Sequence, residues 1–408
     1  MSTPAPHGHV LVARLDSVGD ILLAGPAVRA VAASAERVTM LVGRGRGAVA
    51  RLLPGVDDVI EYAAPWVVPD PGALDAAAVD TLVAQVREAR VDAGLILTSF
   101  HQSPLPLALL LRLAGVGWLG AISEDYPGSL LDLRHQMPDG SHERQRGEPT
   151  GGRGGSSPHT TESADVPESE RALSLARAAG FTLDGPATLA VRHPLPDVTD
   201  LVGASHERRR GGRSGGRGGS ASLAAGPYVV YPPGADAPAR RPGAEQSRAI
   251  VTALVQAGHR VVVTGSPAES TLTGFVANGL ALDLTGAVDL AGLAAVLEGA
   301  EVVVAPNTGP AHLAAAVGTP VVSLFAPVVP PERWAPYGVP VVLLGDQSAA
   351  CRLTRARHCP VPGHPCLDTV EPATVVDAVA RLVQPAQAPS AGTPTGAPAR
   401  PREVDHVR

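Results

Sequence analysis

Short apolar runs rich in β-branched residues alternate with stretches of helical periodicity along most of the chain. This alternation is typical of parallel β-sheets that are covered by α-helices. The pattern runs through once before residue 120 and again after residue 227, and a chain of 408 residues is too long for one ordinary core. We therefore predict an α/β fold of two Rossmann-like domains that face each other across a cleft.

The pattern also predicts individual elements. In the first half we expect strands at 9–14, 37–42, 58–61 and 93–98, with helices at 20–33, 73–89 and 105–115. In the second half we expect strands at 228–232, 260–264, 301–305 and 320–325, with helices at 243–257, 269–278, 290–298 and 309–317. A last helix from Pro372 to Gln384 would close the second domain.

Two internal segments interrupt the alternation. Residues 142–168 and 203–225 are rich in Gly, Arg and Ser, and they cannot bury enough apolar surface to offset the entropy of ordering. We predict an N-terminal Rossmann-like domain over 1–195, in which 142–168 is a disordered insertion. A linker over 196–226 would lead to a C-terminal Rossmann-like domain over 227–384, followed by a disordered tail over 385–408.

The charged residues limit the chemistry. The chain contains no lysine, so its 33 basic side chains are all arginine. This excludes Schiff-base chemistry and a P-loop lysine, so contacts to phosphate must come from arginine or from the backbone. The net charge of −6 gives no general attraction to nucleic acid.

The sequence also suggests where the protein works. The amino terminus lacks the features of a signal peptide, and no apolar run approaches the ~18 residues that a membrane span would need. Three cysteines, all late in the chain, argue against a secreted disulfide framework. We therefore expect a cytoplasmic protein.

The first candidate site is the turn between the strand at 9–14 and the following helix. This loop contains Arg14, Asp16, Ser17 and Gly19, and it ends at Asp20. Ligands of open α/β sheets bind at the carboxyl ends of the strands, where a carboxylate can take a proton from a sugar hydroxyl. Either aspartate could instead cap the helix, and spacing alone slightly favours the cap.

The second candidate site is the turn Asn307-Thr308-Gly309, which opens a helix with Pro310 in its first turn. The free amides and the positive dipole end of such a helix start bind phosphate readily. His312 would lie near a bound diphosphate. The alternative is an ordinary capped helix with a surface histidine.

Two further loops of the second half could reach the same ligand. Arg240 and Arg241 follow the sequence Pro232-Pro233-Gly234, and adjacent arginines there could neutralise a leaving diphosphate, or could simply be solvated. Glu269 follows the strand at 260–264 and could hold ribose hydroxyls or favour a helix start.

At these four places the sequence resembles the ADP-heptose:lipopolysaccharide heptosyltransferases, glycosyltransferase family 9. The likeness is most specific from Arg14 to Ile21, from Asn307 to Ala316, and along Phe325-Ala326-Pro327 and Glu332-Arg333-Trp334-Ala335-Pro336-Tyr337-Gly338. The resemblance implies a GT-B fold and inverting sugar transfer that needs no metal and no cofactor.

The resemblance also implies roles for single residues. Asp20 matches the family's general base, which reverses the preference for a cap, and Glu269 matches an acidic residue that contacts the donor's nucleoside. Asn307 stands where the family often has Asp. The family's lysine in the Pro-Gly loop is absent, so Arg240 or Arg241 would replace it.

The predicted function is therefore inverting, metal-independent transfer of a heptose or related sugar in cell-envelope polysaccharide synthesis. The donor would be a nucleotide-activated sugar and the acceptor a glycan or glycolipid. Peripheral contact with the inner membrane face is a further expectation, and no specific nucleic acid is expected as a partner. A nucleotide-sugar 2-epimerase and a non-catalytic nucleotide-sugar or RNA-binding protein are the alternatives. For Cys351, Cys359 and Cys366, with His358 and His364 between them, we favour a local structural role over zinc binding.

Overall fold

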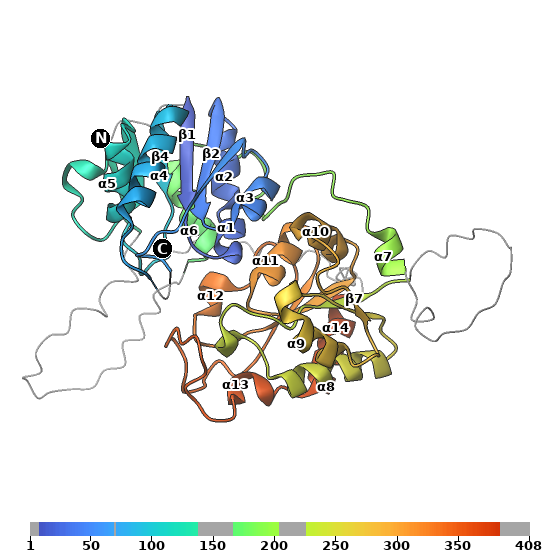
Figure 1. Ribbon diagram of the computed structural model, residues 1–408. Coiled ribbons are helices and arrows are strands. Elements are labelled where there is room, and N and C mark those ends of the chain that lie inside the picture. The colour runs from blue at the N-terminus through green and yellow to red at the C-terminus, as the bar shows by residue number, and fades with distance from the viewer. Residues whose placement is uncertain (1–7, 69–70, 138–165, 204–225, 384–408) are drawn as a thin grey trace, which may run out of the picture.

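The computed structural model describes residues 8–68, 71–137, 166–203 and 226–383. These residues form two parallel six-stranded sheets with helices packed against them (Figure 1). The expected α/β fold of two Rossmann-like sheets is confirmed.

The two sheets repeat one topology. The first has the order β3 (Asp58–Tyr62), β2 (Arg37–Gly43), β1 (His9–Arg14), β4 (Ala93–Ile96), β5 (Trp118–Ile122) and β6 (Leu133–His135). The second has the order β12 (Val341–Leu344), β11 (Val321–Leu324), β10 (Val302–Pro306), β7 (Val229–Tyr231), β8 (Val261–Val263) and β9 (Leu282–Asp283). In both sheets the order reverses direction beside the first strand, and ligands of doubly wound folds bind at such points.

The helices of the first sheet differ from the prediction in three places. They are α1 (Val18–Leu23), α2 (Gly25–Ala32), α3 (Gly47–Leu52), α4 (Ala76–Ala89), α5 (Leu105–Leu113) and α6 (Glu168–Ala178). The single helix predicted at 20–33 is divided at Ala24, because Pro26 has no amide hydrogen to continue the helical ladder. β5, β6, α3 and α6 were not predicted.

The helices of the second half largely follow the prediction. They are α8 (Ala244–Gln256), α9 (Ser270–Ala277), α10 (Leu290–Glu298), α11 (Gly309–Ala316), α12 (Pro331–Trp334), α13 (Pro365–Asp368) and α14 (Pro372–Val383). The strands β9 and β12 and the short helices α12 and α13 are additions to the predicted set.

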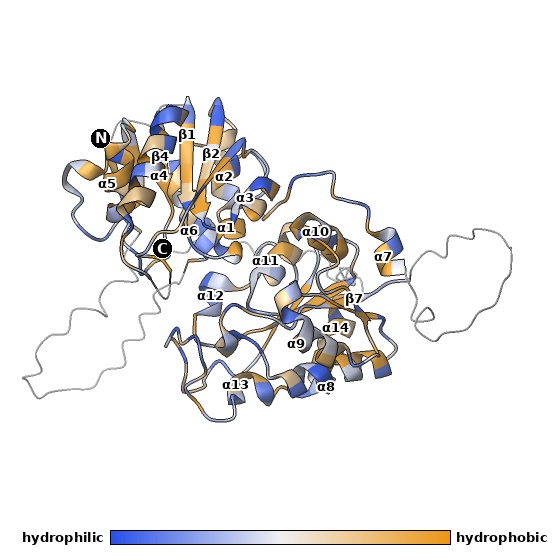
Figure 2. Cartoon of the chain, viewed as in Figure 1, coloured by the Kyte–Doolittle hydropathy of each residue, from blue (hydrophilic) through white to orange (hydrophobic). Residues whose placement is uncertain are grey.

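The hydrophobic core extends across both halves of the molecule. Figure 2 shows hydrophobic residues concentrated in the strands of both sheets. One cluster of buried side chains joins Val12 and Leu22 of the first half to Ala305 and Leu313 of the second. Helix α1 packs against α11 at this junction (Figure 1). The helix that follows β1 is therefore in direct contact with the helix that follows β10.

The described residues include parts of the predicted insertion and of the predicted linker. Residues 142–165, 204–225 and 385–408 lie outside the described residues. The end of the predicted insertion is wrong, because Glu168 is the first residue of α6 and is buried. Within the predicted linker, Thr199–Gly203 forms the short helix α7. No helix in the described part of the chain is long and apolar enough to cross a membrane.

Candidate active site

The turn after β1 positions Asp20 through a capping box at the start of α1. Ser17 is the N-cap residue, and its side chain accepts a hydrogen bond from the Asp20 amide. In return, the backbone nitrogen and hydroxyl of Ser17 donate to Asp20 Oδ2 at 3.2 Å and 2.7 Å. Asp20 is therefore the third helical residue and not the cap itself. Its second oxygen, Oδ1, is left to face the interior of the site.

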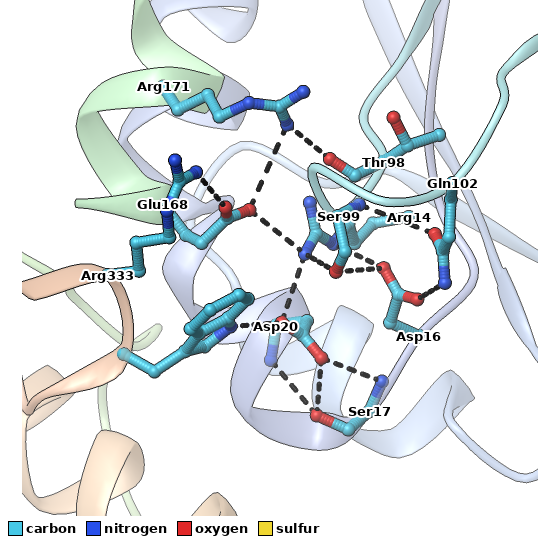
Figure 3. Close-up of polar contacts among 11 residues, drawn as sticks. Arg14, Asp16, Ser17, Asp20, Thr98, Ser99, Gln102, Glu168, Arg171 and Arg333 are labelled. Atoms are coloured by element: carbon cyan, nitrogen blue, oxygen red, sulfur yellow. Dashed lines mark hydrogen bonds and ion pairs between the residues drawn. The ribbon is translucent and has the colours of Figure 1, made fainter. Parts of the chain in front are cut away.

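Arg14 is the centre of a buried charge cluster (Figure 3). Its guanidinium contacts Asp16 Oδ2 at 2.9 Å, Asp20 Oδ1 at 3.0 Å and Glu168 Oε2 at 3.4 Å. Arg14 and Glu168 are only 2% and 1% exposed, so water screens these pairs little. Arg171 and Arg333 approach Glu168 from two further sides.

The two aspartates of the loop have opposite pKa shifts. Burial opposes ionisation of Asp20, but Arg14 and hydrogen bonds from Ser17 and Trp334 lower its pKa to about 2. Burial raises the pKa of Asp16 to about 6 in spite of Arg14 and a hydrogen bond from Gln102. Asp20 is thus the carboxylate that the site holds ionised.

The start of α11 faces the start of α1. A Cβ atom added to Gly19 would lie 2.5 Å from His312 Cδ2, and one added to Gly309 would lie 3.0 Å from Val18 Cγ1. Thr308 is the N-cap residue of α11, but its side chain makes no capping hydrogen bond. The first amides of α11 therefore have no side-chain cap, which suits an anion.

Two buried side chains beside this helix start have unused polar atoms. Asn307 Nδ2 and His312 Nδ1 are buried and have no hydrogen-bond partner among the described residues. Burial lowers the pKa of His312 to about 4, so its ring is neutral near pH 7. Since buried polar atoms are normally paired, both atoms are available to a ligand.

The adjacent arginines of the Pro-Gly loop have different electrostatic neighbours. Burial lowers the pKa of Arg240, while the neighbouring Asp20 carboxylate raises it, and Arg240 also acts on His312. Arg241 instead acts on Tyr231 and His364. Burial raises the pKa of Tyr231 and lowers that of His364, and Arg241 lowers both pKa values. Of the two arginines, Arg240 is therefore the one that acts electrostatically on Asp20 and His312 at the two helix starts.

Glu269 is held in a second capping box. Its Oε2 accepts from the backbone nitrogen and hydroxyl of Ser266, both at 2.8 Å. The carboxylate also lies against Gly234, where an added Cβ would come within 1.6 Å of Oε1. The helix-start interpretation of Glu269 is confirmed, and its contact with a nucleoside stays a prediction.

Several residues of the site were not predicted. Helix α12 brings Arg333 to 3.6 Å from Glu168 Oε1, and the Trp334 indole nitrogen to 3.2 Å from Asp20 Oδ1. Arg333 and Arg355 also lie over the Phe100 ring, 4.6 Å and 5.8 Å from its centroid. Arg333 and Trp334 lie in a stretch that resembles family 9, but that resemblance carried no role for them.

The cysteines lie away from this cluster. Cys351 and Cys366 are buried, Cys359 is partly buried, and all three pack in or against the core of the second sheet. Among the described residues, no group of three His, Cys, Asp or Glu side chains could hold a metal ion.

The fold and the facing helix starts define a protein of the GT-B class, the class of two-domain glycosyltransferases. Residues 198–363 match the family model of glycosyltransferase family 9 (heptosyltransferase). The resemblance seen in the sequence is thereby confirmed over this segment.

Solved structures show the same fold over nearly the whole chain. A family 9 glycosyl transferase from Veillonella parvula is 14% identical, with a TM-score of 0.67 over 94% of this chain and 99% of its own. ADP-heptose LPS heptosyltransferase II of E. coli is 18% identical, with a TM-score of 0.62 over 92% and 98%. E. coli heptosyltransferase WaaC with ADP is 18% identical, with a TM-score of 0.59 over 92% and 99%. A comparison with curated protein sequences finds no match.

Proposed function

We propose that the protein transfers a heptose or related sugar, with inversion, from a nucleotide-activated donor to a hydroxyl of a glycan or glycolipid. The observation that carries this proposal is the contact between α1 and α11, which sets Asp20 of the first half beside Thr308, Gly309 and His312 of the second. One helix start supplies a carboxylate, and the other supplies uncapped amides for a phosphate.

The reaction is a single displacement. The acceptor oxygen attacks the anomeric carbon on the face opposite the diphosphate, and its proton passes to Asp20. The bond between the anomeric carbon and the phosphate oxygen breaks, and both of its electrons leave with the nucleoside diphosphate. Because the site holds Asp20 ionised, it is ready to accept a proton, although its pKa of about 2 makes it a weak base. Such a base suits a hydroxyl that becomes acidic as positive charge develops on the sugar.

The second half would bind the donor. Free amides at the start of α11 and the charge of Arg240 would stabilise the leaving diphosphate. Neutral His312 and the Asn307 amide would add hydrogen bonds from their unpaired nitrogen atoms. With Arg240 in the lysine's place, we propose that the charge of the leaving group is balanced without a metal ion or other cofactor.

The donor and the reaction can be tested in sequence. Because the E. coli relatives were solved with ADP and with ADP-2-deoxy-2-fluoro heptose, ADP-heptose is tested first by thermal shift, followed by GDP-, UDP- and dTDP-sugars. Transfer from the stabilising donor is then measured for wild type, Asp20→Ala and Asp20→Asn, with and without EDTA.

Loss of Asp20 should reduce turnover by about 10²–10⁴-fold while nucleotide binding is retained. EDTA should have no effect. Undiminished transfer by both Asp20 variants would show that Asp20 is not the base. Conversion of the donor without any acceptor would favour the epimerase, and binding without any turnover would favour a non-catalytic protein.

A further inference from the structure

All hydrogen-bond-accepting positions of the Asp20 carboxylate are occupied. Oδ2 accepts from the backbone nitrogen and hydroxyl of Ser17. Oδ1 accepts from Arg14 at 3.0 Å and from the Trp334 indole at 3.2 Å. An ionised carboxylate offers about four lone-pair positions, and four donors occupy them here. An acceptor hydroxyl can therefore donate to Asp20 only by replacing one of these donors.

Three of the four donors are fixed to Asp20 locally. The two from Ser17 belong to the capping box of the same helix, and Arg14 is the last residue of β1 and is held by two other carboxylates. Trp334 instead lies on α12, which follows β11 of the second sheet. It is also the one uncharged side-chain donor on Oδ1, so it is the donor that costs least to replace.

A buried ion pair between the two halves holds Trp334 in this position. The preceding residue, Arg333, lies 3.6 Å from Oε1 of Glu168 at the start of α6. The Arg333 guanidinium also covers the Phe100 ring, which itself lies 5.9 Å from the Trp334 ring. Helix α12 is thus docked on the first half by Arg333, with the indole of Trp334 turned to Asp20.

We propose that the indole N–H of Trp334 occupies the position of the attacking acceptor hydroxyl, and that the Arg333–Glu168 pair holds it there until an acceptor replaces it. This inference rests on the proposed function. It places the acceptor hydroxyl between Asp20 and Phe100, at a position that Trp334 of the second half occupies when no acceptor is bound. The ligand class is a sugar hydroxyl that can donate one hydrogen bond to Oδ1.

Kinetics with a substituted tryptophan tests the exchange. Trp334→Phe keeps an aromatic ring but removes the competing donor, so the acceptor KM should fall roughly five- to tenfold while the donor KM is unchanged. Tyr337→Phe is the matched control, since it removes a hydrogen bond from the same segment to Glu170, away from Asp20. An unchanged or higher acceptor KM in Trp334→Phe, or an equal fall in Tyr337→Phe, would overturn the proposal.

A spectroscopic test needs no turnover. The chain has three tryptophans, so its indole N–H signals in a ¹⁵N NMR spectrum can be assigned by single Trp→Phe substitutions. The Trp334 signal should move in Asp20→Ala but not in Glu269→Ala, which removes the carboxylate of the other capping box. A Trp334 signal that ignores Asp20→Ala would disprove the contact itself.

The same spectrum tests the ion pair. Glu168→Gln should move the Trp334 signal, and Arg333→Gln should do the same if the first variant does not fold. No movement in a folded variant would remove Arg333 and Glu168 from the proposal. If these signals behave as expected but no donor supports transfer, the proposed function fails and the contact stands.

Discussion

Asp16 and Asp20 share one arginine but respond to pH in opposite directions. Folding lowers the pKa of Asp20 from 3.8 to about 2, so its stabilising contribution is present above about pH 4 and is lost as the pH falls toward 2. Folding raises the pKa of Asp16 from 3.8 to about 6, chiefly through burial. Protonated Asp16 is therefore favoured in the folded state, and that stabilisation is lost as the pH rises from about 4 to above 6.

Two variants with the same change of charge separate these effects. Against wild type, Asp20→Asn should lose about 2 kcal/mol of unfolding free energy at pH 7, and less of it at pH 3. Asp16→Asn mimics the protonated acid, so its stability relative to wild type should rise by about 3 kcal/mol between pH 4 and pH 7. Urea unfolding at pH 3–7 measures both. Parallel pH profiles for the two variants would contradict the opposite shifts.

The paired arginines allow a sharp comparison at one turn. Arg240→Ala should weaken binding of a nucleoside diphosphate about tenfold or more, because it removes a cation beside the start of α11. Arg241→Ala removes the same charge beside Tyr231 and His364, and it should change affinity less than twofold. Isothermal titration calorimetry with ADP measures the affinity of both variants. Equal losses of affinity would show that only the net charge matters.

Sequence reasoning found the residues of the site that lie in local turns. Asp20, Asn307 and Glu269 each lie in the turn after a strand, within six residues of its end, so the strand pattern placed them at the carboxyl ends of the sheets. It did not find Glu168, which lies 154 residues from Arg14 and beside a Gly/Arg-rich stretch. A buried ion pair between distant segments has no periodic signal. The choice between Arg240 and Arg241 likewise depended on tertiary structure.

At the scale of elements, the close approach of α1 and α11 depends on a residue without a side chain. Gly19 stands where a Cβ atom would lie 2.5 Å from the buried ring of His312. The backbone of Gly19 is not in the left-handed region, so space and not backbone conformation requires glycine here. The facing helix starts are therefore a packing feature as well as a chemical one.

A single methyl group should separate the two helices. Gly19→Ala should destabilise the protein by about 1–3 kcal/mol and reduce transfer more than nucleotide binding, because Asp20 moves away from α11. Gly274→Ala in α9 is the matched control: an added Cβ meets nothing within 4 Å there, so helix propensity should raise stability slightly. Thermal unfolding and the transfer assay measure both. A Gly19→Ala protein with full stability and activity would show that the helices can adjust.

The elements that were missed are mostly short or lie at sheet edges. β9 has two residues and β6 has three, too few to show a period. Four of the longer helices, α4, α5, α8 and α14, were predicted to within a few residues because each carries an apolar face of helical period. The eleven-residue helix α6 was missed. The repetition of one strand order in both halves could be seen only in outline, since the pattern shows the alternation of elements but not their pairing.

At the scale of the whole molecule, the shared core predicts that the two halves unfold together. Leu313 of α11 is fully buried in the cluster that also contains Leu22 and Leu53. Its replacement by alanine should cost about 2–5 kcal/mol and move one common transition for both halves. Tryptophan fluorescence reports partly on Trp118 in the first sheet, and far-UV circular dichroism reports on both. Leu280→Ala, at an exposed position, is the control. Two separate transitions in the Leu313 variant would show that the halves are independent.

Because of the capping box at α1, the backbone amide proton of Ser17 should report on the state of Asp20. The backbone N–H of Ser17 donates to the same carboxylate that is proposed to receive the acceptor's proton. Protonation of Asp20 would weaken that bond, and a second hydroxyl on the carboxylate would compete with it. Hydrogen–deuterium exchange at this single peptide group would therefore follow the state of the base during turnover, without any label in the site.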